Sequence, residues 1–106
     1  MKDDKIISDD GQNTIGRNIR WIRQTQGIRQ TEMVARLQLY RVAITRETLV
    51  KIEGGRQHIK LKQLRGFRDV FGVTYEDILD HPGEKLLREA EKKNMPLPPE
   101  DMEEDK

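Results

Sequence analysis

The sequence predicts a small all-α domain flanked by tails, and three observations lead to this prediction. Apolar residues recur three and four positions apart in successive stretches, which is the spacing of one helix face. Glycines follow several of these stretches, where a helix end often needs a positive φ. The 106 residues suit one domain, and a hydrophobic content of 34% against 37% charged residues favours a small core with unpacked ends.

The first helix is expected after a tail. Residues 1–13 lack apolar periodicity and contain the run Asp-Asp-Gly-Gln-Asn, so we expect a disordered N-terminal tail. Asn13 or Thr14 can cap the helix, and Gly27 ends it. Its apolar face consists of Ile15, Ile19 and Ile22. Trp21 falls outside this face, which leaves two readings: it packs on a tail or neighbouring loop, or it contacts a partner.

The second helix is expected at residues 30–39, with an inner face of Met33, Val34 and Leu37. Arg29 at its N-cap is a poor capping residue. The connection that follows, Tyr40-Arg41-Val42-Ala43, has neither glycine nor proline. We therefore expect no tight turn with a positive φ, but either a helix that overruns or a longer loop.

The third helix is expected to start at Thr45, a good N-cap, and to stop at Gly54 and Gly55. Leu49 and Ile52, three positions apart, face inward. The exposed first turn then reads Arg46-Glu47-Thr48. Such a turn is unusual in a purely structural helix, because all three side chains can hydrogen-bond base edges or phosphates.

Two further helices complete the predicted domain. The fourth, at residues 60–71, has an apolar stripe and ends at Gly72; the stripe contains Leu61, Leu64, Phe67, Val70 and Phe71. Thr74 and Asp77 have the spacing of a capping box for a short fifth helix.

The C-terminal part, residues 82–106, is expected outside the domain, which would span 14–81. Residues 84–93 have a narrow apolar stripe of Leu86, Leu87 and Ala90, so a sixth helix there needs a partner surface. The run Met95-Pro-Leu-Pro-Pro99 favours an extended form, and an acidic tail follows. The competing expectation for this region is a disordered, solubilising tail.

Charge is distributed unevenly along the chain. Residues 14–68 contain 13 Lys and Arg against three Glu, a net +10, while residues 1–13 sum to −2 and residues 69–106 to −7. A basic middle between acidic ends is typical of a polyanion-binding domain. The alternative is a set of merely solvated faces, and the scarcity of acids in the middle favours the first reading.

The sequence lacks the residues that several classes of function require. Without cysteine there is no disulfide or cysteine-based zinc site, and His58 and His81 lack ligand spacing. No nucleophile–base set or phosphate-binding loop is present, and Glu47 with Glu53 is the only carboxylate pair near the basic region. We expect no enzyme, cofactor or metal. No membrane-spanning run or leader occurs, so we expect a cytoplasmic, nucleoid-associated protein.

An ordered set of anchor residues spans about residues 15–80. It comprises Ile15, Gly16, Ile19, Arg20, Ile22, Arg23, Gly27, Ile28, Gln30, Met33, Val34, Leu37, Ile44, Thr45, Arg46, Thr48, Leu49, Lys51, Ile52, Glu53, Gly55, Leu61, Leu64, Phe71, Gly72, Val73, Asp77, Ile78 and Leu79. With these anchors the chain resembles the Cro/CI-type helix-turn-helix family, also called the XRE family. The resemblance implies a five-helix domain that lays helix 45–53 in the major groove of double-stranded DNA.

The resemblance also implies roles for single residues. Thr45 corresponds to the cap of the recognition helix that touches backbone or base. Arg46, Glu47 and Thr48 correspond to its base-reading first turn, with Lys51 one turn further on.

Other positions match phosphate contacts of the family. Gln30 corresponds to a glutamine that binds a phosphate and braces the recognition helix. Arg56, after Gly54 and Gly55, and Lys60 correspond to further phosphate contacts. Arg23 and Glu53 match a partly buried structural salt bridge.

One stretch departs from the family pattern. From Leu37 to Thr45 the spacing is about five residues longer than usual and contains no glycine. This departure leaves the angle between the second and third helices open, and it places Arg41 where it could reach a phosphate.

The leading functional expectation is a sequence-specific transcriptional regulator, expected to be a repressor, that binds operator DNA as a homodimer. The alternative is an antitoxin-like module that combines the same domain with a protein partner bound through residues 84–106. A partner in a membrane is not expected.

Overall fold

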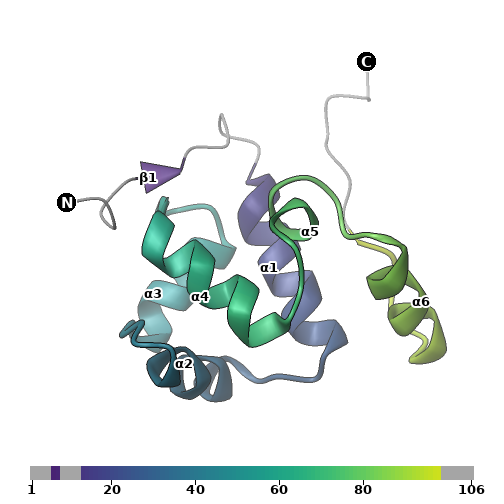
Figure 1. Cartoon of the computed structure of the whole chain (residues 1–106), viewed down its shortest axis with the longest axis horizontal. Coiled ribbons are helices and arrows are strands. Elements are labelled where there is room, and N and C mark those ends of the chain that lie inside the picture. The colour runs from purple at the N-terminus through teal and green to yellow at the C-terminus, as the bar shows by residue number, and fades with distance from the viewer. Residues whose placement is uncertain (1–5, 8–12, 99–106) are drawn as a thin grey trace.

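The computed structural model describes residues 6–7 and 13–98, and in these residues the fold is all-α, as predicted (Figure 1). The helices are α1 (Thr14–Thr25), α2 (Gln30–Leu39), α3 (Arg46–Glu53), α4 (Leu61–Phe71), α5 (Tyr75–Leu79) and α6 (Glu84–Lys92). The expected ranges of α2 and α3 and the capping box of α5 are confirmed. In that box the Asp77 N–H donates to Thr74 Oγ1, and the Thr74 N–H donates to Asp77 Oδ2.

A two-residue strand lies inside the predicted N-terminal tail. β1 (Ile6–Ile7) pairs antiparallel with β2 (Ile59–Lys60), with Ile6 opposite Lys60 and Ile7 opposite Ile59. The expectation of an unstructured 1–13 segment is therefore wrong at these two residues, while most of that segment lies outside the described residues. The reason is that the backbone partners of β1 come from a distant stretch, which local periodicity does not reveal.

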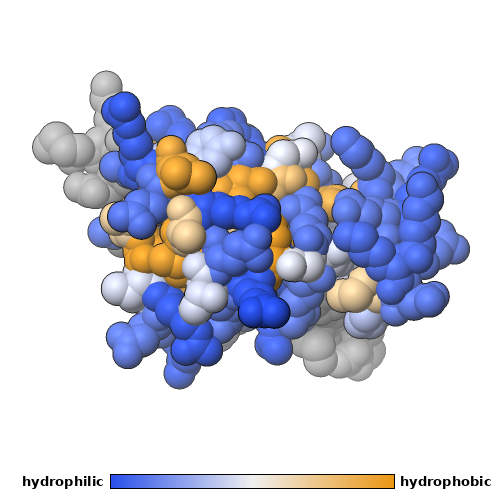
Figure 2. Space-filling view, turned by 90° about the horizontal axis from the view of Figure 1, so that it is seen from below, coloured by the Kyte–Doolittle hydropathy of each residue, from blue (hydrophilic) through white to orange (hydrophobic). Residues whose placement is uncertain are grey.

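Hydrophilic side chains dominate the face on the α2 side, but apolar surface is also open on that face (Figure 2). Leu39 is 82% exposed and Tyr40 is 49% exposed, both where α2 ends. Single exposed apolar residues are common in monomeric proteins. These two lie at the end of α2, directly before the connection between α2 and α3.

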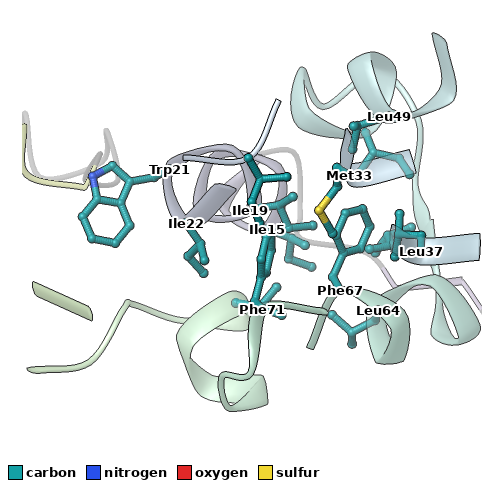
Figure 3. Packing of buried hydrophobic residues seen from close by; sticks show 14 of the residues in the cluster. Ile15, Ile19, Trp21, Ile22, Met33, Leu37, Leu49, Leu64, Phe67 and Phe71 are labelled. Atoms are coloured by element: carbon teal, nitrogen blue, oxygen red, sulfur yellow. The ribbon is translucent and has the colours of Figure 1, made fainter. Parts of the chain in front are cut away.

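The core lies between α1 and the other helices. Ile15, Ile19 and Ile22 of α1 point toward α4 and α2, where Met33 and Leu37 meet Phe67 (Figure 3). These side chains are buried, together with Leu49 from α3 and Ile78 from α5. The side chain of Asn18 adds a polar tie, donating to the carbonyls of Ile78 at 2.9 Å and Asp80 at 3.1 Å. One apolar cluster therefore packs the five helices α1 through α5 together.

A close backbone approach joins α1 to the end of α3. A Cβ at Gly16 would collide with the carbonyl oxygens of Ile52 and Glu53, so this position requires glycine. Asn13 precedes the helix with a left-handed φ of 56°, and its side chain makes no capping bond. Instead Asn13 Nδ2 donates to the Glu53 carbonyl at 3.1 Å. Of the two residues expected to cap α1, Asn13 occupies the N-cap position, but its side chain makes no capping bond because its amide binds the neighbouring helix.

The connection from 40 to 45 contains a positive φ that the sequence did not predict. Arg41 has φ 65°, and α2 ends there with the two hydrogen bonds of a Schellman motif. The Val42 N–H donates to the Leu37 carbonyl at 3.0 Å, and the Arg41 N–H donates to the Gln38 carbonyl at 2.9 Å. The expectation of no such turn is wrong, because burial of Val42 holds the backbone in a conformation that Arg41 alone does not favour.

Glycine at position 66 allows that burial. A Cβ there would lie 2.8 Å from Val42 Cγ2 and 3.0 Å from Leu37 Cδ2. Without a side chain at Gly66, α4 can pack directly against the turn that ends α2. The direction of the chain into α3 is therefore determined by packing against α4 as well as by the turn itself.

The opposite side of α1 is covered by the C-terminal segment. Trp21 is buried, and its Nε1 donates to the Pro96 carbonyl at 2.8 Å. Figure 3 shows Trp21 pointing away from the isoleucine face of the same helix. Leu86 and Ala90 of α6 are buried as well, and Lys93 Nζ donates to the Thr25 carbonyl at 2.7 Å.

These contacts decide between the alternatives that the sequence left open for Trp21 and for the C-terminal segment. Trp21 packs on the C-terminal segment, which is the simpler of its two alternatives. The disordered-tail reading is wrong for residues 84–98, because α6 finds in α1 the partner surface that its narrow stripe needs. Residues 99–106 lie outside the described residues.

We predict that Arg41→Gly stabilises the protein by about 1 kcal/mol, because glycine adopts a positive φ without the cost that a Cβ imposes. Ala35→Gly, in the exposed interior of α2, is the control and should destabilise it by about 1 kcal/mol. Urea unfolding measures both. A loss of stability in Arg41→Gly would contradict the left-handed conformation.

We also predict that ending the chain after His81 exposes Trp21 and shifts its fluorescence to longer wavelength. The chain has a single tryptophan, so the signal is unambiguous. Stability should fall by roughly 2 kcal/mol or more, since burying one leucine side chain contributes about 1.5–3 kcal/mol. Leu97→Ala, at an exposed position, should leave emission and stability unchanged. Unaltered emission in the shortened chain would disprove the packing of this segment on α1.

Candidate nucleic-acid interface

The helix α3 is built to present one polar face. Thr45 caps it, accepting from the Thr48 N–H at 3.0 Å, while the Thr45 hydroxyl donates to Thr48 Oγ1 at 3.1 Å. Leu49 and Ile52 are buried against the core. The side chains of Arg46, Glu47 and Lys51 are exposed. Because the apolar residues occupy the buried face, these polar side chains on the first two turns of α3 remain exposed to solvent.

A buried ion pair anchors the far end of α3. Arg23 Nε donates to Glu53 Oε2 at 2.7 Å, and Arg23 Nη2 donates to Glu53 Oε1 at 3.0 Å. Arg23 is 7% exposed and Glu53 is 5% exposed. Two further bonds complete the cluster: Arg23 Nη1 donates to the Ile28 carbonyl at 2.9 Å, and Gln30 Nε2 donates to Glu53 Oε1 at 3.3 Å. The pair therefore joins α1, the start of α2 and the end of α3.

A hollow of about 670 Å³ opens beside this pair. We call it the arginine hollow, and its exposed basic residues are Arg20, Arg29, Arg46 and Arg56. Within the described part of the chain none of these four forms an ion pair, and the one carboxylate of the lining, Glu53, is bound to Arg23 and Gln30. Four cations around one occupied carboxylate create a positive potential that attracts anions.

The hollow gathers some of the predicted site residues and not others. Gln30, Arg46 and Arg56 line it, next to the Arg23–Glu53 pair. Thr45, Thr48 and Lys60 line a different groove on the other side of α3. Glu47, Lys51 and Arg41 are exposed and line neither, Arg41 standing at the end of α2.

The sequence reading missed Arg20 and Arg29 as members of this surface. A signal for Arg20 was present, since it lies three positions before Arg23 and so shares a side of α1 with it. Arg29 directly precedes Gln30 and supplies the N-cap position of α2 without a side-chain capping bond. Only the packing of α1 against α2 and α3 brings the two into one hollow.

Other kinds of site find little support in the residues that the structure describes. They contain no group of three or more His, Asp or Glu side chains placed to hold a metal ion. None of their helices has the length and apolar character needed to cross a bilayer. Searches against protein-family models, curated proteins and solved structures gave no match to this chain.

We predict that Glu53→Ala destabilises the protein by about 3–5 kcal/mol, because it leaves the Arg23 guanidinium buried without its counter-ion. Glu32→Ala is the matched control, since Glu32 pairs with Arg36 at 2.6 Å on the exposed side of α2. That change should cost less than about 1 kcal/mol. Urea unfolding compares them, and similar losses in both variants would refute the role given to the buried pair.

Proposed function

We propose that this protein is a sequence-specific DNA-binding transcriptional regulator of the Cro/CI helix-turn-helix type, with α3 as its major-groove helix. The observation that carries the proposal is the arginine hollow beside α3. A polyanion is the partner that the four arginines of this hollow favour, and the neighbouring helix offers the polar side chains that can distinguish bases. The resemblance of the anchor residues to that family points the same way.

Phosphates would supply most of the affinity. Arg20, Arg29 and Arg56 stand around the start of α2, whose first N–H groups receive no side-chain cap from Arg29. Free N–H groups at a helix start and adjacent guanidinium groups both favour a phosphate oxygen. Gln30 would add a contact while its amide keeps Glu53 in place. Lys60, on the other side of α3, would reach a second phosphate.

Base selection would fall to the exposed first turn of α3. Arg46 can bind a guanine with two parallel hydrogen bonds, and Glu47 can accept from a cytosine amino group or orient Arg46. Lys51, one turn later, extends the same face. Thr45 and Thr48 already bond to each other, so their remaining capacity suits backbone contacts or a single base edge.

Arg41 supports the proposal through its backbone. A non-glycine residue at φ 65° is less stable than glycine would be, and such outliers tend to occur at functional positions. Its exposed guanidinium at the turn before α3 is suited to a phosphate. An arginine at this position then has a physical reason, because a contact with DNA would offset its cost in stability.

A homodimer on a two-fold operator is the arrangement we propose, since one short helix contacts few base pairs. Repression would follow from occupying a promoter, and the protein would act in the cytoplasm at the nucleoid. No reacting group or cofactor is required for this function.

A second candidate is an antitoxin-like module, for which the exposed Leu97 is the favouring observation. Leu97 is 78% exposed in the segment that packs on Trp21. Because residues 84–98 already pack on α1, a partner would meet a formed surface there rather than order it. This candidate keeps the DNA-binding surface and adds a protein contact, so it modifies the first proposal without replacing it.

We predict that Arg46→Ala weakens binding to a selected DNA site by about 1–3 kcal/mol and leaves binding to random DNA nearly unchanged. Gel-shift titrations on both DNAs measure this difference. Arg88→Ala, on the exposed face of α6, is the control and should alter neither affinity. Equal weakening on both DNAs would make Arg46 a phosphate contact, and the absence of any salt-dependent DNA binding would refute the proposed function.

A further inference from the structure

A second groove lies on the other side of α3, opposite the arginine hollow. It measures about 400 Å³ and opens between the later part of α2, the first turn of α3 and the segment that leads into α4. We call it the amide groove after Gln38, Gln57 and Gln63, which line it. The longer connection between α2 and α3 provides part of its wall, so the departure from the family pattern creates this surface.

The amide groove differs chemically from the arginine hollow. Val34, Ala43 and Ile44 give it an apolar part, while three amides, the hydroxyls of Thr45 and Thr48, and one ammonium group give it a polar part. No carboxylate lines it, and Lys60 is its single charged residue. Apart from the ammonium group of Lys60, this surface is a poor site for a phosphate, since apolar carbon near a phosphate removes hydration without replacing it.

Two of the amides are free to bind a ligand. Gln63 is already engaged, because its Oε1 accepts from the Lys60 N–H at 2.8 Å. The side chains of Gln38 and Gln57 are exposed and make no hydrogen bond to any described residue. Each offers an adjacent donor and acceptor, which is the pattern that the N7 and N6 positions of adenine complement.

We infer that the amide groove recognises an A·T base pair through its major-groove edge. The thymine methyl lies against Ala43 and Ile44, and the amide of Gln38 or Gln57 bonds the adenine. Both features are needed, since the methyl group and the adenine pattern belong to the two bases of one pair. This inference rests on the proposed DNA-binding function and specifies the base chemistry on one side of α3.

The test begins with DNA sites selected by the full chain from a random pool. Each thymine of a selected site is then replaced in turn by uracil, which removes only the methyl group. We expect one replacement in each half-site to weaken binding about fourfold, the factor that corresponds to roughly 0.8 kcal/mol for one buried carbon. Replacing the other thymines should have little effect.

Gln38→Ala and Gln57→Ala provide the protein side of the test, with Gln24→Ala, an exposed glutamine on α1, as the matched control. At least one of the first two should weaken binding roughly tenfold and relax the base preference at the uracil-sensitive position only. The control should bind as the unchanged protein does. Thermal unfolding and Trp21 emission report whether each variant keeps its fold.

The outcomes distinguish a failure of the proposed function from a failure of the A·T assignment. If no sequence is enriched, or DNA binding shows no salt dependence, the proposed function fails. If sites are enriched but no uracil replacement matters, and both glutamine variants match Gln24→Ala, the inference fails while the proposed function stands. If a glutamine variant loses equal affinity for selected and random DNA, the groove contacts the backbone and the assignment to A·T is overturned.

Discussion

The structure depends on the buried pair of Arg23 and Glu53. Charged groups are rarely buried without a partner, because losing hydration costs several kcal/mol per ion. Here one guanidinium spans three elements, reaching the carboxylate at the end of α3 and the Ile28 carbonyl before α2, while Gln30 reaches the same carboxylate. Because each member needs the others, these contacts allow few relative positions of α1, α2 and α3. The main contribution of the pair is therefore to fix the relative orientation of these three helices.

Two glycines allow the close contacts through which the other helices pack on this arrangement. Gly16 lets α1 approach the carbonyls at the end of α3, and Gly66 lets α4 approach Leu37 and Val42. The second approach holds the turn at Arg41 in a left-handed conformation that arginine does not favour by itself. The start of α3 is thereby positioned by packing, and its end by the ion pair. A helix held at both ends is suited to present side chains rigidly, as base recognition requires.

The two sides of α3 are lined by side chains of different chemistry. Arginines gather on the side of α1 and the start of α2, whereas amides and small apolar groups gather on the side of α4. The helix α6, whose three Glu are balanced by three Lys or Arg, packs on the far face of α1 through Trp21, Leu86 and Ala90 (Figure 1). Two of its carboxylates are paired, Glu84 with Arg88 and Glu89 with Lys93, and α6 therefore adds no net negative charge beside the arginine hollow.

The sequence by itself determined what depends on near neighbours in the chain. The bounds of α2 and α3, the cap at Thr45 and the capping box at Thr74 and Asp77 follow from spacing within a few residues, and they were predictable for that reason. The pair of Arg23 and Glu53 was expected only through the family resemblance, since thirty positions separate them.

Only the tertiary structure decided what depends on distant neighbours. The positive φ of Arg41 follows from packing against Gly66, the side-chain bond of Asn13 from the approach of α3, and the burial of Trp21 from the segment that contains Pro96. Arg20 and Arg29 belong to the candidate site for the same reason. Each of these contacts joins residues from separate elements, and no local pattern encodes which separate elements meet.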